Sequence, residues 1–161
     1  MSRETDIADD IRTRMVDWRH DLHANPETAF EEHRTAQVVA DALMEMQISV
    51  HRGLGVTGVV GTLKNGDGPS IALRADMDAL NMQELGASGH KSTHDGKMHG
   101  CGHDGHTAML LGAAVHLARH RPFRGTVHFI FQPAEENEGG GKSATVSGLP
   151  SGPITYLTLG R

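Results

Sequence analysis

The stretch MHGCGHDGHTAMLLGAA, residues 98–114, joins a cluster of potential metal ligands to a run of apolar residues. It holds the only cysteine of the chain and three histidines: Cys101, His99, His103 and His106. Beyond them, apolar side chains recur at helical spacing, which predicts an amphipathic helix over residues 106–119. The sequence therefore places the ligand cluster directly before a helix that is buried on one face.

Helical and strand patterns alternate on both sides of this stretch. Apolar residues at helical spacing predict helices over residues 7–22 and 31–46. Short apolar runs predict strands in four places: residues 48–52, 54–63, 125–132 and the first part of 70–80. Residues 82–99 have no clear period and are expected to form a long loop. Helices interleaved with apolar strands predict a three-layer α/β fold, in which a sheet carries helices on both faces.

Composition and charge exclude several classes of protein. The chain has 161 residues, a net charge of −5 with neutral histidines and no basic block, which argues for one domain that does not bind nucleic acid. No apolar run approaches the ~20 residues of a membrane span, and the charged N-terminal sequence has no signal-peptide core. One cysteine makes no internal disulfide, which is typical of a reducing compartment. We therefore expect a cytoplasmic protein without a nucleic-acid or membrane partner.

Polar clusters stand at three predicted strand ends or helix starts. Asp76 and Asp78 follow one strand, Glu135 and Glu136 follow another, and the cysteine–histidine cluster opens the helix. In open α/β sheets, ligands bind beyond the carboxyl ends of the strands. The three clusters are therefore expected to line one crevice.

The residue types in this crevice are typical of a metal site. Cys101 as a thiolate and His103 as a neutral imidazole are ligands for borderline divalent ions. The adjacent carboxylates Glu135 and Glu136 repel each other unless a cation lies between them, and one can bind the ion while the other accepts a proton from water. Each cluster alone also fits a solvated turn, and Cys101 with a histidine also fits a nucleophilic pair.

Three motifs in this order resemble those of the M20 metallopeptidase family: RADMDAL at residues 74–80, the stretch quoted above, and FQPAEE at residues 131–136. They are similar in particular to the amidohydrolase branch, which includes hippurate hydrolase, N-acyl-amino-acid amidohydrolases and plant auxin-conjugate hydrolases. Residues 19–43 resemble the N-terminal signature of that branch. The resemblance covers residues from about 17 to 141 and implies the catalytic-domain fold of zinc aminopeptidases.

The resemblance implies a two-metal amide hydrolase that acts on N-acyl amino acids such as hippurate. By motif position, Cys101, His103 and Glu136 match metal ligands, which suit zinc, manganese or cobalt ions. Glu135 matches the general base that activates water, and Asp78 matches a catalytic-site aspartate near the base and the metals. The resemblance leaves two further motif residues without a settled role: Asp76, which stands where peptidase relatives carry a histidine ligand, and His106.

The C-terminal part of the chain departs from the family pattern. Relatives are longer, with two further histidine ligands and a second, lid-like domain through which they form homodimers. No histidine follows His128, and the sequence after Lys142 is unlike that of the family. We expect residues 1–141 to form the N-terminal part of the catalytic domain, and residues 142–161 to be a divergent tail, disordered or frame-shifted. We therefore expect the amidohydrolase activity of this chain to be weak or absent. The alternative is a non-catalytic metal-binding or interaction module on the same fold.

Overall fold

The computed structural model of the protein describes residues 8–136 and 154–158. Its helices are α1 (Asp9–Ala24), α2 (His33–Glu45) and α3 (His103–His120). Its strands are β1 (Ser49–Leu54), β2 (Gly58–Asn65), β3 (Ser70–Asp76), β4 (Gly125–Gln132) and β5 (Ile154–Thr158). These strands form one sheet in the order β1-β2-β4-β3-β5, so β4 lies between two strands that precede it in the sequence.

The strand directions bring two strand ends to the same edge of the sheet. β1 and β2, and β2 and β4, pair antiparallel, whereas β3 pairs parallel with both β4 and β5. In the register of β3 and β4, Asp76 at the end of one strand lies opposite Gln132 at the end of the other. The residues that follow these two strands therefore leave the sheet side by side.

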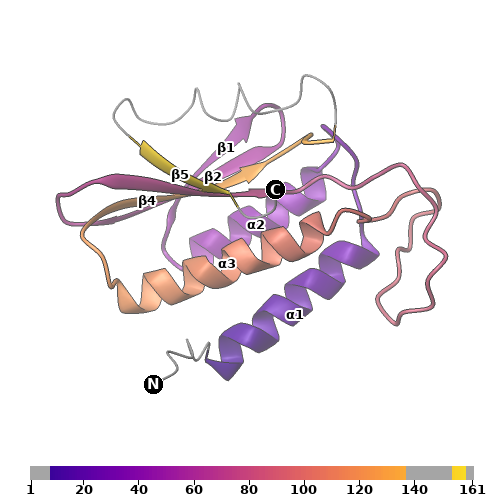
Figure 1. Cartoon of the computed structure of the whole chain (residues 1–161), viewed down its shortest axis with the longest axis horizontal. Coiled ribbons are helices and arrows are strands. Elements are labelled where there is room, and N and C mark those ends of the chain that lie inside the picture. The colour runs from indigo at the N-terminus through magenta and orange to yellow at the C-terminus, as the bar shows by residue number, and fades with distance from the viewer. Residues whose placement is uncertain (1–7, 137–153, 159–161) are drawn as a thin grey trace.

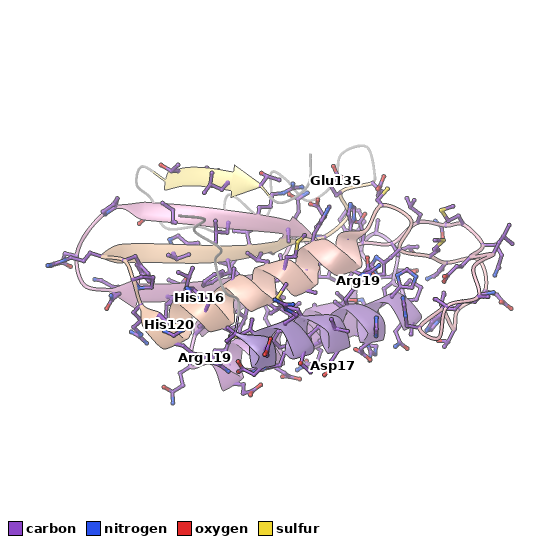
Figure 2. All side chains as sticks on the ribbon, turned by 60° about the horizontal axis from the view of Figure 1, so that its bottom comes forward. Asp17, Arg19, His116, Arg119, His120 and Glu135 are labelled. Carbon is purple, nitrogen blue, oxygen red and sulfur yellow. The ribbon has the colours of Figure 1, made fainter. Side chains whose placement is uncertain are left out.

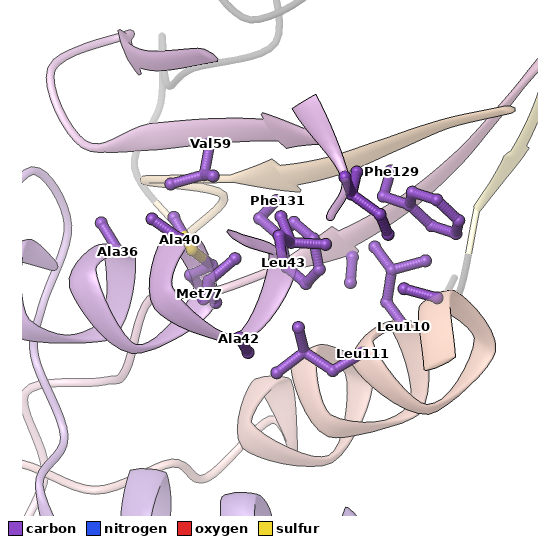
Figure 3. Close-up of a cluster of buried hydrophobic side chains, with 14 of the residues drawn as sticks. Ala36, Ala40, Ala42, Leu43, Val59, Met77, Leu110, Leu111, Phe129 and Phe131 are labelled. Carbon is purple, nitrogen blue, oxygen red and sulfur yellow. The ribbon is translucent and has the colours of Figure 1, made fainter. Parts of the chain in front are cut away.

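α2 and α3 cover one face of the sheet, and α1 packs on α3 farther from the strands (Figure 1). The main hydrophobic core lies between these helices and the sheet, where Leu43 of α2, Leu110 of α3 and Phe129 of β4 are buried together (Figure 3). Gly112 allows α1 to approach α3 closely, because a Cβ at this position would lie 2.4 Å from the Sδ of Met15. Each large apolar side chain buried in this way contributes about 1.5–3 kcal/mol, so the core fixes α3 firmly against the sheet.

The structure confirms the predicted α/β fold. The predicted helices and strands are present, with ends that differ by a few residues. The difference that matters for the site is at α3, which begins at His103 rather than at residue 106. Gly102 precedes the helix with a φ of 80°, a left-handed conformation that glycine adopts readily. The apolar periodicity that predicts this helix begins only at Met109, which explains why the predicted start is late.

The described helices lie on one side of the sheet (Figure 1). The second helical layer that the sequence predicts is not among the residues that the structure describes. Apolar side chains are nevertheless buried on the opposite face of the sheet, where Val60, Ala72 and Ile130 form a separate small cluster. Within the described residues, no helix is long and apolar enough to cross a membrane.

Part of the segment expected to be a divergent tail forms an edge strand. β5 pairs in parallel with β3, and its Tyr156 and Leu157 side chains are exposed. Residues 137–153 and 159–161 lie outside the described part of the chain. The disorder or frame shift expected in this segment therefore stays a prediction.

Candidate active site

The ends of β3 and β4 and the start of α3 enclose a cavity of about 430 Å³. The side chains that line it come from all three sequence clusters: Arg74, Asp76, Cys101, His103, His106, Glu135 and Glu136. Figure 2 shows Glu135 near the first turn of α3, at the end opposite His116, Arg119 and His120. The three clusters thus meet in one crevice at the carboxyl ends of the parallel strands.

His103 is buried, and its two ring nitrogens have different surroundings. Nδ1 lies 2.8 Å from the backbone oxygen of Asp78, and because that oxygen can only accept, Nδ1 carries the proton of this bond. Nε2 lies 3.9 Å from Oδ2 of Asp76 and 3.8 Å from Oε1 of Glu136. In the neutral ring Nε2 therefore has the free lone pair, as in a histidine that binds a metal through one nitrogen and is held by the other.

Asp78 supports the site from behind His103 instead of lining the cavity. Its Oδ1 lies 3.2 Å from Nδ1 of His103, and its Oδ2 accepts the backbone N–H of Glu136 at 2.9 Å. Burial acts to raise the pKa of Asp78, but hydrogen bonds from His103 and from the Glu136 and Glu135 backbones outweigh it, and the pKa is lowered. For His103, burial acts to lower the pKa, but the bond to Asp78 and the charge of Asp76 outweigh it, and the pKa is raised. Each group thus stabilises the charged form of the other.

Arg74 fixes Asp76 at the wall of the cavity. A guanidinium nitrogen of Arg74 lies 2.5 Å from Oδ1 of Asp76, and its Nε donates to Oε1 of Gln132 at 2.6 Å. Burial raises the pKa of Asp76, and the positive charges of Arg74 and His103 offset this effect only in part. The sequence patterns assign no role to Arg74; the available signal is a cation inside an apolar strand, two residues before an aspartate.

Cys101 and Glu136 form the outer rim of the cavity. Cys101 is exposed, with its thiol beside the carboxylate of Glu136. The interaction with Glu136, together with burial of the thiol and the charges of nearby carboxylates, raises the pKa of Cys101 to about 11. The thiol is then protonated near neutral pH, whereas a nucleophilic cysteine needs a lowered pKa. These surroundings disfavour the nucleophilic pair.

Two sets of side chains in the cavity have the spacing of a cation site. The candidate ligand atoms lie within 4.8 Å of one another in each set: Asp76 with His103 and His106, and His103 with Glu135 and Glu136. Zinc bonds of about 2.0–2.2 Å place the donors of a tetrahedral site about 3.2–3.6 Å apart. The 3.8 Å between Nε2 of His103 and Oε1 of Glu136 therefore has to close by only a few tenths of an ångström. The residues present fit a divalent cation, and Cys101 lines the same cavity outside both sets.

A second buried polar network lies behind the start of α3. Nδ1 of His23 lies 2.9 Å from Oδ2 of Asp104, and Nε2 of His23 lies 3.4 Å from Oε1 of Glu84. Arg19 approaches the same oxygen of Asp104 at 3.4 Å. The network ties α1 and the long loop before α3 to the first turn of α3. Nothing in the spacing of the sequence indicates these pairings.

The fold and the cavity together define an α/β domain with a site for a divalent metal. The sequence pattern of peptidase family M20/M25/M40 matches residues 72–158, more than half of the chain, and the chain belongs to this family. It is 50% identical over 136 residues to IAA-amino acid hydrolase ILR1-like 4 of Arabidopsis thaliana, across 84% of this chain and 31% of the relative. It is 49% identical over 132 residues to the hippurate hydrolase of Campylobacter jejuni, across 81% of this chain and 34% of the relative.

Solved structures show the same fold. The YXEP protein of Bacillus subtilis, described as a dinuclear metal binding peptidase from the M20 family, has a TM-score of 0.76 and 44% identity. The likeness covers 80% of this chain and 36% of that protein. The chain thus spans about a third of the length of the relatives it matches.

Proposed function

We propose that this chain is part of the catalytic domain of a metal-dependent amidohydrolase that cleaves the amide bond of N-acyl amino acids. The observation that carries the proposal is the position of His103 Nε2, 3.9 Å from Asp76 and 3.8 Å from Glu136, in the cavity that Glu135 also lines. The relatives support the substrate class, since their names include a hippurate hydrolase and an N-acyl-L-amino acid amidohydrolase.

Cys101, His103 and Glu136 are the proposed protein ligands of the metal. A thiolate, an imidazole and a carboxylate together favour zinc, manganese or cobalt ions, because a soft thiolate is a poor ligand for magnesium or calcium. When bound, such an ion supplies a Lewis acid that polarises the amide carbonyl and lowers the pKa of water. Asp76 and His106, which form the other set around His103, are the described residues available to a second ion.

Glu135 is the proposed general base. Its carboxylate lines the cavity, and the backbone on both sides of it is fixed, since the Ala134 N–H is bonded to Glu32 and the Glu136 N–H to Asp78. From this position the carboxylate accepts the proton of the attacking water and passes it to the leaving amine. Asp78, expected from the sequence to be catalytic, acts in this proposal as a positioning residue for His103 and for the turn that carries Glu135.

The proposal predicts that turnover depends on Glu135 and that metal binding does not depend on it. The full chain, loaded with zinc, manganese or cobalt, is assayed on hippurate and on a panel of other N-acyl amino acids. Glu135→Gln should lower kcat by about 10²–10⁴-fold, the usual contribution of a general base, because the amide cannot accept the proton. Metal content should not change. Glu45→Gln, at the exposed end of α2, is the matched control and should keep the wild-type kcat.

The outcomes separate the two candidate functions. We expect weak turnover or none, because the chain spans only about a third of the length of its relatives. Activity that survives Glu135→Gln excludes this residue as the base. Bound metal without turnover in the wild-type chain supports the alternative, a non-catalytic metal-binding module on the same fold. A chain that binds no metal contradicts both.

A further inference from the structure

Glu32 is a buried carboxylate that serves neither as a metal ligand nor as the base in the proposed function. It directly precedes α2, yet its side chain makes no capping bond to that helix. The residue is 0% exposed, and no described basic side chain forms an ion pair with it. Burial raises the pKa of Glu32, as expected for a carboxylate that has left water without a cation. Such a costly group calls for a specific role.

Both carboxylate oxygens of Glu32 are used. Oε2 accepts the hydroxyl of Thr57 at 2.6 Å, and Oε1 accepts the backbone N–H of Ala134 at 2.8 Å. The second bond joins residues that are 102 positions apart in the sequence. Because Ala134 directly precedes Glu135, this bond ends one residue before the proposed base.

Ala134 adopts a conformation that alanine disfavours. Its φ is 53°, in the left-handed region, and its side chain is fully buried. In this region the Cβ of an L-residue comes too close to the following carbonyl oxygen, and only glycine escapes the cost. A non-glycine residue persists there when its surroundings hold it, and such residues gather at functional sites.

We propose that Glu32 is a positioning residue that holds Ala134 in the left-handed conformation and thereby directs Glu135 and Glu136 into the cavity. Asp78 holds the other end of the same turn through the Glu136 N–H, at 2.9 Å. When ionised, the Glu32 carboxylate suits this task, because a charge-assisted bond to an N–H is about twice as strong as a neutral one. This inference rests on the proposed function only where it treats Glu135 as the base. The geometry of the turn is independent of that function.

A double-mutant cycle of Glu32→Ala and Ala134→Gly, measured by cobalt binding to the full chain, tests this role. Glu32→Ala removes the acceptor, and it should weaken cobalt binding about 10–100-fold, as loss of a supporting hydrogen bond does. It should also change the cobalt absorption spectrum, because the ligand Glu136 moves with the turn. Ala134→Gly removes the steric cost of the left-handed backbone. In the Ala134→Gly background, Glu32→Ala should therefore have a much smaller effect on affinity.

Hydrogen exchange of the metal-free chain gives a second readout. The Ala134 amide should exchange slowly in the wild type, faster in Glu32→Gln, which keeps a weaker neutral acceptor, and fastest in Glu32→Ala. Glu27→Ala is the matched control, since Glu27 also accepts backbone N–H bonds, from Arg34 and Thr35, away from the cavity. It should lower the Tm and leave the cobalt spectrum unchanged.

Four results overturn the positioning role. They are an unchanged cobalt spectrum and affinity in Glu32→Ala, an equal loss in both backgrounds, an equal loss in Glu27→Ala, and unchanged Ala134 exchange in Glu32→Gln. The last still decides the question if Glu32→Ala does not fold. None of these measurements needs turnover. A chain that binds cobalt as described but has no amidase activity therefore supports the non-catalytic alternative and leaves this inference standing.

Discussion

The site contains two pairs of carboxylates that are held in opposite ways. The floor pair, Asp76 and Asp78, comes from the end of β3; both residues are buried and bind other protein groups through their side-chain oxygens. The rim pair, Glu135 and Glu136, follows β4, and both residues are more exposed. Around the rim pair it is the backbone that is fixed, while the carboxylates line the cavity.

The difference separates two tasks that carboxylates perform. A carboxylate that positions its neighbours is best buried against them, and its pKa then depends on the balance between burial and these contacts, which lowers the pKa of Asp78 and raises that of Asp76. A carboxylate that exchanges protons with water, or closes on a cation, needs oxygens that face the cavity. Substitution of Asp78, which does not line the cavity, should therefore change mainly stability, and substitutions in the rim pair should change binding and chemistry.

Removal of His103 should have the largest effect, because this ring touches both pairs. His103→Ala should weaken zinc or cobalt binding by more than about 100-fold, above the usual range for residues that only support a ligand. Competition with a chelator of known affinity measures the change. His116→Ala, at the other end of α3 (Figure 2), is the matched control and should bind as the wild type does. An affinity in His103→Ala within about tenfold of the wild type would mean that the ion is held elsewhere.

The floor and rim pairs should differ in their effect on unfolding. Asp78→Asn replaces one acceptor oxygen by an NH2 group, which then faces the N–H of either His103 or Glu136. An unsatisfied buried donor costs about 1–3 kcal/mol, so the free energy of unfolding should fall by that amount. Glu136→Gln on the rim should change it by less than about 0.5 kcal/mol. Denaturant unfolding of the metal-free variants measures both.

The pH dependence gives an internal check on Asp78. Its pKa is lowered from an ordinary value of 3.8, so its contribution to stability is present above that value and is lost as the pH falls through the lowered one. The difference between the wild type and Asp78→Asn should therefore shrink in strong acid. Equal unfolding free energies for the floor and rim variants at neutral pH would remove the distinction between the two pairs.

Sequence patterns predict the site to the level of its three clusters. Asp76 and Glu135 could be placed together because both follow apolar strand patterns, and the carboxyl ends of parallel strands form the ligand edge of an α/β sheet. The start of α3 was harder to place, because Gly102 and His103 precede the apolar periodicity. Local patterns therefore predict which residues reach the crevice, and with less accuracy where the elements begin.

The supporting contacts could not be predicted in this way. The bond from Ala134 to Glu32 spans 102 positions, and the bond from His23 to Asp104 spans 81. Each depends on how α1, α2 and the turn after β4 pack in three dimensions, and no period or motif encodes that distance. The left-handed backbone at Ala134 is hidden for a related reason, since alanine gives no local signal for a positive φ.

The smallest expected effect concerns the proton on the rim thiol. The pKa of Cys101 is raised to about 11, chiefly by its interaction with Glu136, and a thiol must lose its proton to bind a metal ion. Metal binding should therefore release about one proton from Cys101, and the logarithm of the affinity should rise by about one per pH unit between about pH 7 and 9. Titrations at several pH values, with calorimetry in two buffers of different ionisation enthalpy, measure both quantities.

The Cys101→Ser substitution distinguishes the proton that Cys101 releases on metal binding from the proton that His103 releases. Serine does not titrate in this range, so the slope between about pH 7 and 9 should decrease by the contribution of Cys101 if Cys101 is a ligand. The fall in acid should remain, because the pKa of His103 is raised above 6.5 and its protonated ring cannot bind the ion below the raised value. A slope that is unchanged in Cys101→Ser would show that the proton comes from another group, and the ion would then be held by His103 and the carboxylates alone. The comparison of floor and rim would survive that result, because it depends on how the carboxylates are bonded and not on the thiol.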